Sequence, residues 1–141
     1  MSNRRTTVRT LVFGPRGSVL VLRRSLNDDS NPGKVDFPGG GVDPGETVTF
    51  AAVREVEEEA GIHLSEQDIS LVYTFTVYEK SSDTVVTRLL YISHVTSATV
   101  HLSHEHDAFW WHSMDEVVSL FSETSWYEAL WFVREHNLAI G

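Results

Sequence analysis

The chain has 141 residues, of which 41% are hydrophobic and 22% are charged, and it contains no cysteine. These values are typical of one globular domain over residues 1–141, and they exclude disulfide frameworks, extended disorder and thiol chemistry. The net charge of −9 disfavours a nucleic-acid polymer as partner, because binding a phosphate backbone needs a basic surface. No apolar run of about 18 residues predicts a membrane span, and no secretory signal pattern begins the chain, so we expect a cytoplasmic protein.

The N-terminal part alternates between strand-forming and turn-forming segments. Residues 7–13 and 18–23 are rich in β-branched and aliphatic side chains, and the turn Gly14-Pro15-Arg16-Gly17 between them predicts a β-hairpin. Residues 25–34 are turn formers and predict a loop. A short extended segment over 35–37 follows it.

A glycine-rich turn and a helix come next. The run Pro38-Gly39-Gly40-Gly41 predicts a backbone in conformations that are closed to other residues. Residues 47–60 carry apolar side chains at every fourth position, which predicts an amphipathic helix that ends at Gly61. The apolar stripe consists of Val48, Ala52, Val56 and Ala60.

The second half of the chain predicts further strands and a short helix. Residues 69–79 and 85–95 are rich in valine, tyrosine, phenylalanine, threonine and isoleucine, which predicts a second hairpin with its turn at 80–83. Residues 109–111 predict another strand, and residues 114–120 predict a short helix.

The C-terminal segment predicts a final helix. Ser125 and Glu128 have the spacing of a capping box, so we expect the helix to run from there to about His136. Its apolar residues at helical spacing favour core packing or contact with a second copy of the chain, which leaves a homodimer open. These residues are Trp126, Leu130, Trp131 and Val133. The elements in order predict an α+β or α/β/α arrangement around a mixed sheet.

Residues 54–59 carry the most informative chemical pattern. On a helix Glu55, Glu58 and Glu59 fall within an arc of about 100°, while Glu57 points away from it. Like charges at this spacing destabilise an isolated helix, and a bound cation reverses that effect. Three carboxylates without histidine or cysteine suit a hard, oxygen-seeking ion such as Mg²⁺ or Mn²⁺. The alternative is a solvated acidic helix face.

The spacing around this helix adds a second pattern. From Gly40 to Ile62 the chain satisfies G-x5-E-x7-R-E-U-x-E-E-x-G-U, where U is an apolar residue. The run Phe37-Pro38-Gly39-Gly40 leads into it. In these residues the chain resembles the Nudix hydrolase family, of which this pattern is the signature box. The approach from Arg24 looks like that of the MutT-type branch, and the resemblance spans residues 7 to about 118.

The resemblance implies a Nudix-type α/β/α sandwich that hydrolyses a nucleoside diphosphate linked to another group, with Mg²⁺ or Mn²⁺ as cofactor. By this resemblance Glu55, Glu58 and Glu59 are metal ligands, and the carbonyl of Gly39 is a further ligand. Arg54 pairs with the box carboxylates and holds them in place. The residues that support the loop and the backbone shape are Gly40, Glu46 and Gly61. Carboxylates this close titrate together, so which glutamate is the general base stays open.

Residues outside the box are further candidates. Many members of the family have a loop glutamate that completes the metal site or acts as general base, and Glu105 is the candidate here, with Asp107 as the alternative. Arg24 is a candidate contact for substrate phosphates, the other reading being a solvent-facing arginine. Phe37 is a candidate contact for a base, with a core position as its alternative. Residues 1–34 hold seven basic and two acidic side chains, which suggests a basic wall opposite the glutamates.

Two functions of different class follow. The first is a Mg²⁺-dependent pyrophosphohydrolase of nucleoside (deoxy)triphosphates or related nucleotides, in which metal-activated water attacks phosphorus. The second is a non-catalytic nucleotide-binding or sensing domain on the same fold, which the complete box disfavours. An isoprenoid diphosphate isomerase on a related fold would need a cysteine that this chain lacks. We therefore expect a small-molecule nucleotide as partner, and neither a nucleic-acid polymer nor a membrane.

Overall fold

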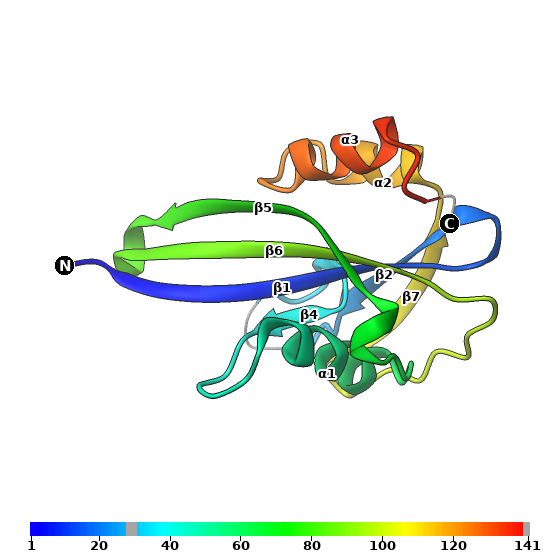
Figure 1. The fold of residues 1–141 in the computed structure, drawn as a ribbon, viewed down its shortest axis with the longest axis horizontal. Helices are drawn as coiled ribbons and strands as arrows, with labels where there is room; N and C mark the ends of the chain where they lie inside the picture. The colour runs from blue at the N-terminus through cyan, green and yellow to red at the C-terminus, as the bar shows by residue number, and fades with distance from the viewer. Residues whose placement is uncertain (28–30, 140–141) are drawn as a thin grey trace.

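The computed structural model describes residues 1–27 and 31–139 and has three layers (Figure 1). A seven-stranded mixed sheet forms the middle layer, with helix α1 on one face and helices α2 and α3 on the other. The strands are β1 (Asn3–Phe13), β2 (Val19–Arg24), β3 (Val35–Asp36), β4 (Gly39–Gly41), β5 (Ser70–Glu79), β6 (Thr84–His94) and β7 (His106–His112). The helices are α1 (Val48–Ala60), α2 (Met114–Leu120) and α3 (Tyr127–Glu135), with short 3₁₀ turns at Pro15–Gly17, Glu66–Asp68 and Lys80–Ser82. The predicted α/β/α sandwich around a mixed sheet is confirmed.

Strand β1 is the centre of the sheet. It pairs in parallel with β6 over its whole length, from Asn3 opposite Thr84 to Phe13 opposite His94. Its start at Asn3 rather than at residue 7 follows from this pairing, because β6 supplies a partner for each of the first residues. Strands β5 and β6 form the predicted second hairpin.

The predicted first hairpin is confirmed, but its paired part is short. Strands β1 and β2 meet at one pair, Phe13 opposite Val19, and then diverge. They diverge because β4 pairs with β1 around Val8, whereas β2 pairs with β7 and β3 instead. The turn at 14–17 therefore joins two strands whose main partners lie far away in the sequence.

The two faces of the sheet bury two sets of apolar side chains. On the α1 side, Val56 and Ala60 pack with Val12, as the predicted stripe requires. On the other side, Leu130 and Val133 of α3 pack in the core.

The start of α3 differs from its prediction in two ways. The helix begins after Trp126 without a side-chain cap, so the predicted capping box is wrong. The Ser125 hydroxyl instead accepts a hydrogen bond from Nη1 of Arg88 at 2.6 Å. Trp131, expected in the core or in a contact between copies, is 46% exposed.

The segment at 25–34 is closed at its base by backbone hydrogen bonds. The N–H of Arg24 donates to Lys34, and the N–H of Gly33 donates to Arg24. These bonds agree with the predicted loop, of which residues 28–30 lie outside the described residues. Within the described ranges, no helix is both long and apolar enough to cross a membrane.

The predicted unusual backbone conformation of the glycine run is wrong. Gly39, Gly40 and Gly41 form the extended strand β4, and none of them has a positive φ. Glycine is needed here because neighbouring atoms lie too close to leave room for a side chain. A β-carbon on Gly39 would lie 2.0 Å from the carbonyl oxygen of Val8, and one on Gly40 would lie 2.7 Å from Oε1 of Glu55. Strand β4 is therefore pressed against both the central strand and the glutamates of α1.

Candidate functional site

Helix α1 presents the glutamates of the box at its C-terminal end. The Thr47 hydroxyl caps its start by accepting the N–H of Phe50, and Gly61 ends it at φ 70°, as predicted. The three glutamates that share a face differ in burial. Glu59 is 6% exposed, and the side chains of Glu55 and Glu58 are 13% and 57% exposed.

Arg54 links the glutamates to the loop that precedes the helix. Its Nε and Nη2 donate to both carboxylate oxygens of Glu46, at 2.6 and 2.8 Å. Its Nη1 donates to Glu55 at 2.9 Å and to Glu58 at 3.2 Å. Such forked contacts are strong and directional. Hydrogen bonds from Arg54 and from the N–H of Asp43 lower the pKa of Glu46, so this carboxylate stays ionised. Arg54 therefore holds three carboxylates in one arrangement.

Glu59 lies deeper and is held from the other side. Its Oε2 accepts the N–H of Gly39 at 3.2 Å. Burial raises the pKa of Glu59 to about 8, although the Gly39 N–H opposes this shift. Burial also raises the pKa of Glu55, whose carboxyl group makes a hydrogen bond with that of Glu59. Two buried carboxyl groups in contact hold a proton between them unless a cation offsets their charge.

These side chains line a cavity of about 430 Å³, here called the glutamate cavity. Its acidic wall contains Glu55, Glu58, Glu59 and Glu105. Its basic wall contains Arg5, Arg9 and Arg24. Gly39, Gly40, Ser103 and His104 complete the lining. The structure therefore brings Glu105 and Arg24, both predicted from outside the box, to the same cavity as the box glutamates.

The donor set fits a hard divalent cation. The negatively charged groups that line the cavity and could bind a metal ion are all carboxylates. Gly40 leaves room beside Glu55 that a larger residue would fill. Within the described ranges, no three histidine, aspartate or glutamate side chains already stand as a set of metal ligands. Arg54 holds Glu55 and Glu58, while Gly39 holds Glu59, so binding a cation requires these side chains to exchange partners.

The raised pKa of Glu59 predicts that Mg²⁺ affinity depends on pH. A ligand carboxyl must lose its proton before it binds metal, so affinity should rise up to tenfold per pH unit from about pH 6 towards the pKa of about 8, and level off above it. Calorimetric Mg²⁺ titration at about pH 6 and about pH 8.5 measures this, with proton release read from buffers of different ionisation enthalpy. Glu59→Gln should remove most of the dependence. A wild-type affinity that is equal at both pH values would contradict the assignment.

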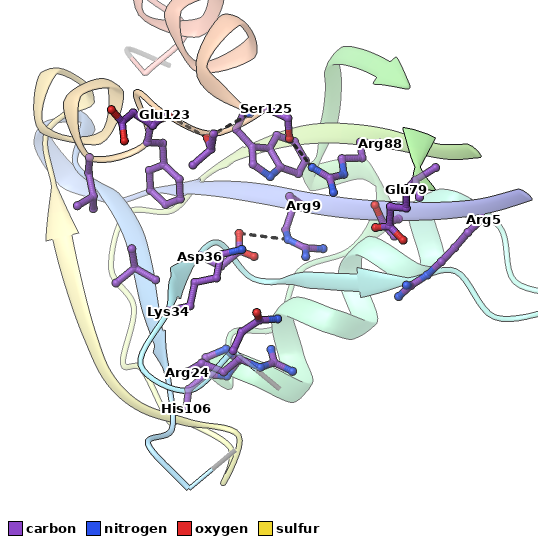
Figure 2. Close-up of a pocket in the computed structure, with 18 residues that line it drawn as sticks. Arg5, Arg9, Arg24, Lys34, Asp36, Glu79, Arg88, His106, Glu123 and Ser125 are labelled. Carbon is purple, nitrogen blue, oxygen red and sulfur yellow. Dashed lines mark hydrogen bonds and ion pairs between the residues drawn. The ribbon is translucent and has the colours of Figure 1, made fainter. Parts of the chain in front are cut away.

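A second cavity of about 720 Å³, here called the arginine cavity, adjoins the first and shares Arg5, Arg9 and Arg24 with it (Figure 2). It lies between the sheet and the loop from α2 to α3. Figure 2 shows Arg9 joined to Asp36, at 3.3 Å, with Arg24 and Arg88 on opposite sides of this pair. The N-terminal basic excess thus contributes three arginines to the predicted wall.

Sequence reasoning did not single out Arg5, Arg9 or Arg88. Arg5 and Arg9 lie on the same side of β1, which alternation along a strand could have indicated. Arg88 joins them because Thr7 pairs with it in the parallel register of β1 and β6. That register links segments about 80 residues apart and has no local signal.

Two candidates lie away from the cavities. Phe37 is 1% exposed and stacks on Phe121 at 4.6 Å between ring centroids, so its predicted contact with a base is wrong and the core alternative holds. Asp107, the alternative to Glu105, accepts a hydrogen bond from Nε of Arg23 at 2.7 Å. It is not among the residues that line either cavity.

Comparisons with known proteins find similar sequences and structures. The family profile described as NUDIX domain matches residues 3–131. The chain is similar to Nudix hydrolase 3 of Caenorhabditis elegans, with 48% identity over 54 residues that cover 38% of this chain and 22% of that protein. Matches to the curated relatives span between 22% and 31% of their lengths.

Two solved structures share the fold. A MutT protein from Methanosarcina mazei Go1 superposes with a TM-score of 0.75 and 29% identity, covering 96% of both chains. An Ap4A hydrolase of C. elegans, solved as a binary complex, superposes with a TM-score of 0.72 and 21% identity, covering 96% of this chain and 99% of that one.

Proposed function

Since the chain belongs to the Nudix family, we propose that it is a divalent-metal-dependent hydrolase that cleaves the phosphoric anhydride of a nucleoside diphosphate linked to another group. The observation that carries the proposal is that carboxylates and arginines line the same glutamate cavity. Arg54 gathers carboxylates on one wall, and Arg5, Arg9 and Arg24 stand on the other. Opposed carboxylates and arginines suit a phosphate chain bound through a cation.

The metal site we propose consists of Glu55, Glu58 and Glu59, with the Gly39 carbonyl and Glu105 completing it. A bound Mg²⁺ supplies charge neutralisation at the phosphates and lowers the pKa of a bound water. When the metal ion binds, Glu55 and Glu59 lose the proton that they share, and the positive charge of the ion replaces it. Arg54 holds Glu55 and Glu58 near the site before the cation binds, and Glu46 fixes Arg54 to the loop.

The arginines bind and orient the substrate in this proposal. Arg24 and Arg9 contact phosphate oxygens from the wall opposite the glutamates. Their fixed charge also withdraws electron density from phosphorus, which favours attack by water and departure of the leaving phosphate. Nucleoside (deoxy)triphosphates and related nucleotides are the substrates that we expect. The presence of an Ap4A hydrolase among the structural neighbours adds dinucleoside polyphosphates to the panel to be tested.

Glu105 is the candidate general base from outside the helix. Because it lines the glutamate cavity, Glu105→Gln should lower kcat by about a hundredfold or more, while KM changes little. Steady-state kinetics on a nucleoside triphosphate with Mg²⁺ measure this. Asp107→Asn is the matched control, because it changes a nearby carboxylate that pairs with Arg23 outside the cavity. Wild-type turnover in Glu105→Gln would return the base to one of the box glutamates.

The competing function is a non-catalytic nucleotide-binding or sensing domain. Intact box residues favour the enzyme, since binding alone does not require the complete set of glutamates. Incubation of a nucleotide panel with Mg²⁺ and with Mn²⁺, followed by identification of the broken P–O bond, separates the two. Tight binding of a nucleotide with no turnover under either metal would favour the sensor.

A further inference from the structure

Arg88 is held in a fixed position at the far side of the arginine cavity. Its Nη1 donates to the Ser125 hydroxyl at 2.6 Å, and its guanidinium lies over the ring of Trp126, 5.5 Å from the centroid. Both contacts come from the two residues just before α3, and Figure 2 shows Ser125 next to Arg88. They orient the guanidinium and leave its other N–H donors without a hydrogen bond to the described residues.

Arg88 lies among charges of both signs but has no direct ion pair with a described residue. Among the described residues, no carboxylate lies within ion-pairing distance of it, and burial lowers its pKa, as do Arg9 and Arg5 nearby. Glu79 and Asp36 act in the opposite direction, each more strongly than Arg5, and Asp36 is already paired with Arg9. Because no described carboxylate contacts this half-buried cation directly, a bound anion in hydrogen-bond contact with it would stabilise it further.

The surroundings indicate the kind of anion. Arg88 pairs in register with Thr7, so Arg5 and Arg9 lie two residues to either side of it on the same face of the sheet. These two arginines also line the glutamate cavity, so arginines extend from the proposed metal site to Arg88, with Asp36 and Glu79 beside them. Guanidinium groups bind phosphate through paired N–H donors better than they bind single-oxygen acceptors.

We propose that Arg88 binds a phosphoryl group of the substrate other than the two phosphates of the cleaved anhydride. This inference rests on the proposed function, because the anhydride defines where the rest of the substrate extends. Substrates with an additional phosphate are therefore preferred over otherwise identical ones without it. The extra phosphate belongs either to a longer linear chain or to the sugar.

The test compares matched substrate pairs. Adenosine 5′-tetraphosphate against ATP tests a longer chain, and NADPH against NADH tests a phosphate on the ribose. For the wild-type protein with Mg²⁺, kcat/KM should favour the phosphate-rich member of one pair by about tenfold, mainly through KM. Which pair shows the preference identifies the position of the phosphate.

Variants of Arg88 then assign the preference to this side chain. Arg88→Met should reduce the ratio to about one, and Arg88→Lys should keep part of it. Ser125→Ala releases the guanidinium but keeps its charge, so it should lower the ratio by a few-fold. This variant also keeps the proposal testable if Arg88→Met does not fold. Arg4→Met is the matched control, because it removes an arginine from β1 that lines neither cavity, and it should keep the wild-type ratio.

The outcomes separate the two proposals. If the wild-type protein prefers neither phosphate-rich compound, or if Arg88→Met changes both members of a pair equally, the Arg88 subsite is wrong. If no anhydride is cleaved with any divalent metal, the proposed function fails. Calorimetric Kd values for the same compounds then test whether Arg88 binds the additional phosphate. A Kd preference that Arg88→Met removes supports the subsite, and equal Kd values overturn it.

Discussion

Glu58→Gln is expected to lower kcat for Mg²⁺-dependent hydrolysis by about a thousandfold while the protein stays folded. Glu58 is the most exposed of the three box glutamates on the cavity face, so glutamine should fit in its place without disturbing the core. The substitution removes one negative charge from the proposed metal site and one contact of Arg54. Steady-state kinetics with a nucleoside triphosphate measure the loss, and circular dichroism verifies the fold. Glu55→Gln should have an effect of similar size.

Glu57→Gln is the matched control for Glu58→Gln. Glu57 is the next residue on the same helix, but it points away from the cavity and pairs with His63 at 3.3 Å. The two variants change the net charge equally and keep the same side-chain volume, so a difference in kcat reports on position alone. Full activity in both Glu58→Gln and Glu55→Gln would exclude these residues as metal ligands.

Arg54→Met is expected to weaken Mg²⁺ affinity and to lower kcat by about tenfold to a hundredfold each. Arg54 makes forked hydrogen bonds to Glu46 and contacts Glu55 and Glu58, so its loss leaves three carboxylates to repel one another. The midpoint of thermal unfolding should also fall. Lysine should not restore activity, because a single ammonium group cannot reproduce the fork.

The control for Arg54→Met is Arg134→Met on α3. Arg134 pairs with Asp115 and Glu135 at the surface, at 3.5 and 3.2 Å, and such exposed pairs contribute little. Its replacement should leave kcat and Mg²⁺ affinity at wild-type values. Wild-type Mg²⁺ affinity in Arg54→Met would show that the box glutamates need no support from this arginine.

The parts of the site that sequence reasoning predicted are those whose contacts are local. Arg54 reaches Glu46, Glu55 and Glu58 within eight residues along the chain, and the phase of the helix places Glu55 and Glu58 on one face. The box spacing therefore predicts this cluster before any tertiary structure is known. The helix bounds followed for the same reason, because Thr47 and Gly61 carry the signals of its ends.

The predictions that were wrong or missing concern features that are determined by contacts between distant segments of the chain. The long parallel pairing of β1 with β6 depends on a register across about 80 residues, and strand-forming composition does not encode it. The glycine run was recognised as special, but its reason is the approach of Val8 and Glu55 rather than its own dihedral angles. Phe37 could not be assigned either, because its stacking partner Phe121 comes from a helix end far along the chain.

The most direct test of the account is phosphorus NMR of the purified chain with a nucleotide panel, with Mg²⁺ and after chelation. The panel holds a nucleoside triphosphate, ADP-ribose and a dinucleoside polyphosphate. We predict that at least one anhydride is cleaved with Mg²⁺, that chelation stops the reaction, and that Glu58→Gln abolishes it while Glu57→Gln does not. Cleavage that persists after chelation, or binding without cleavage under Mg²⁺ and Mn²⁺, would contradict a metal-dependent hydrolase.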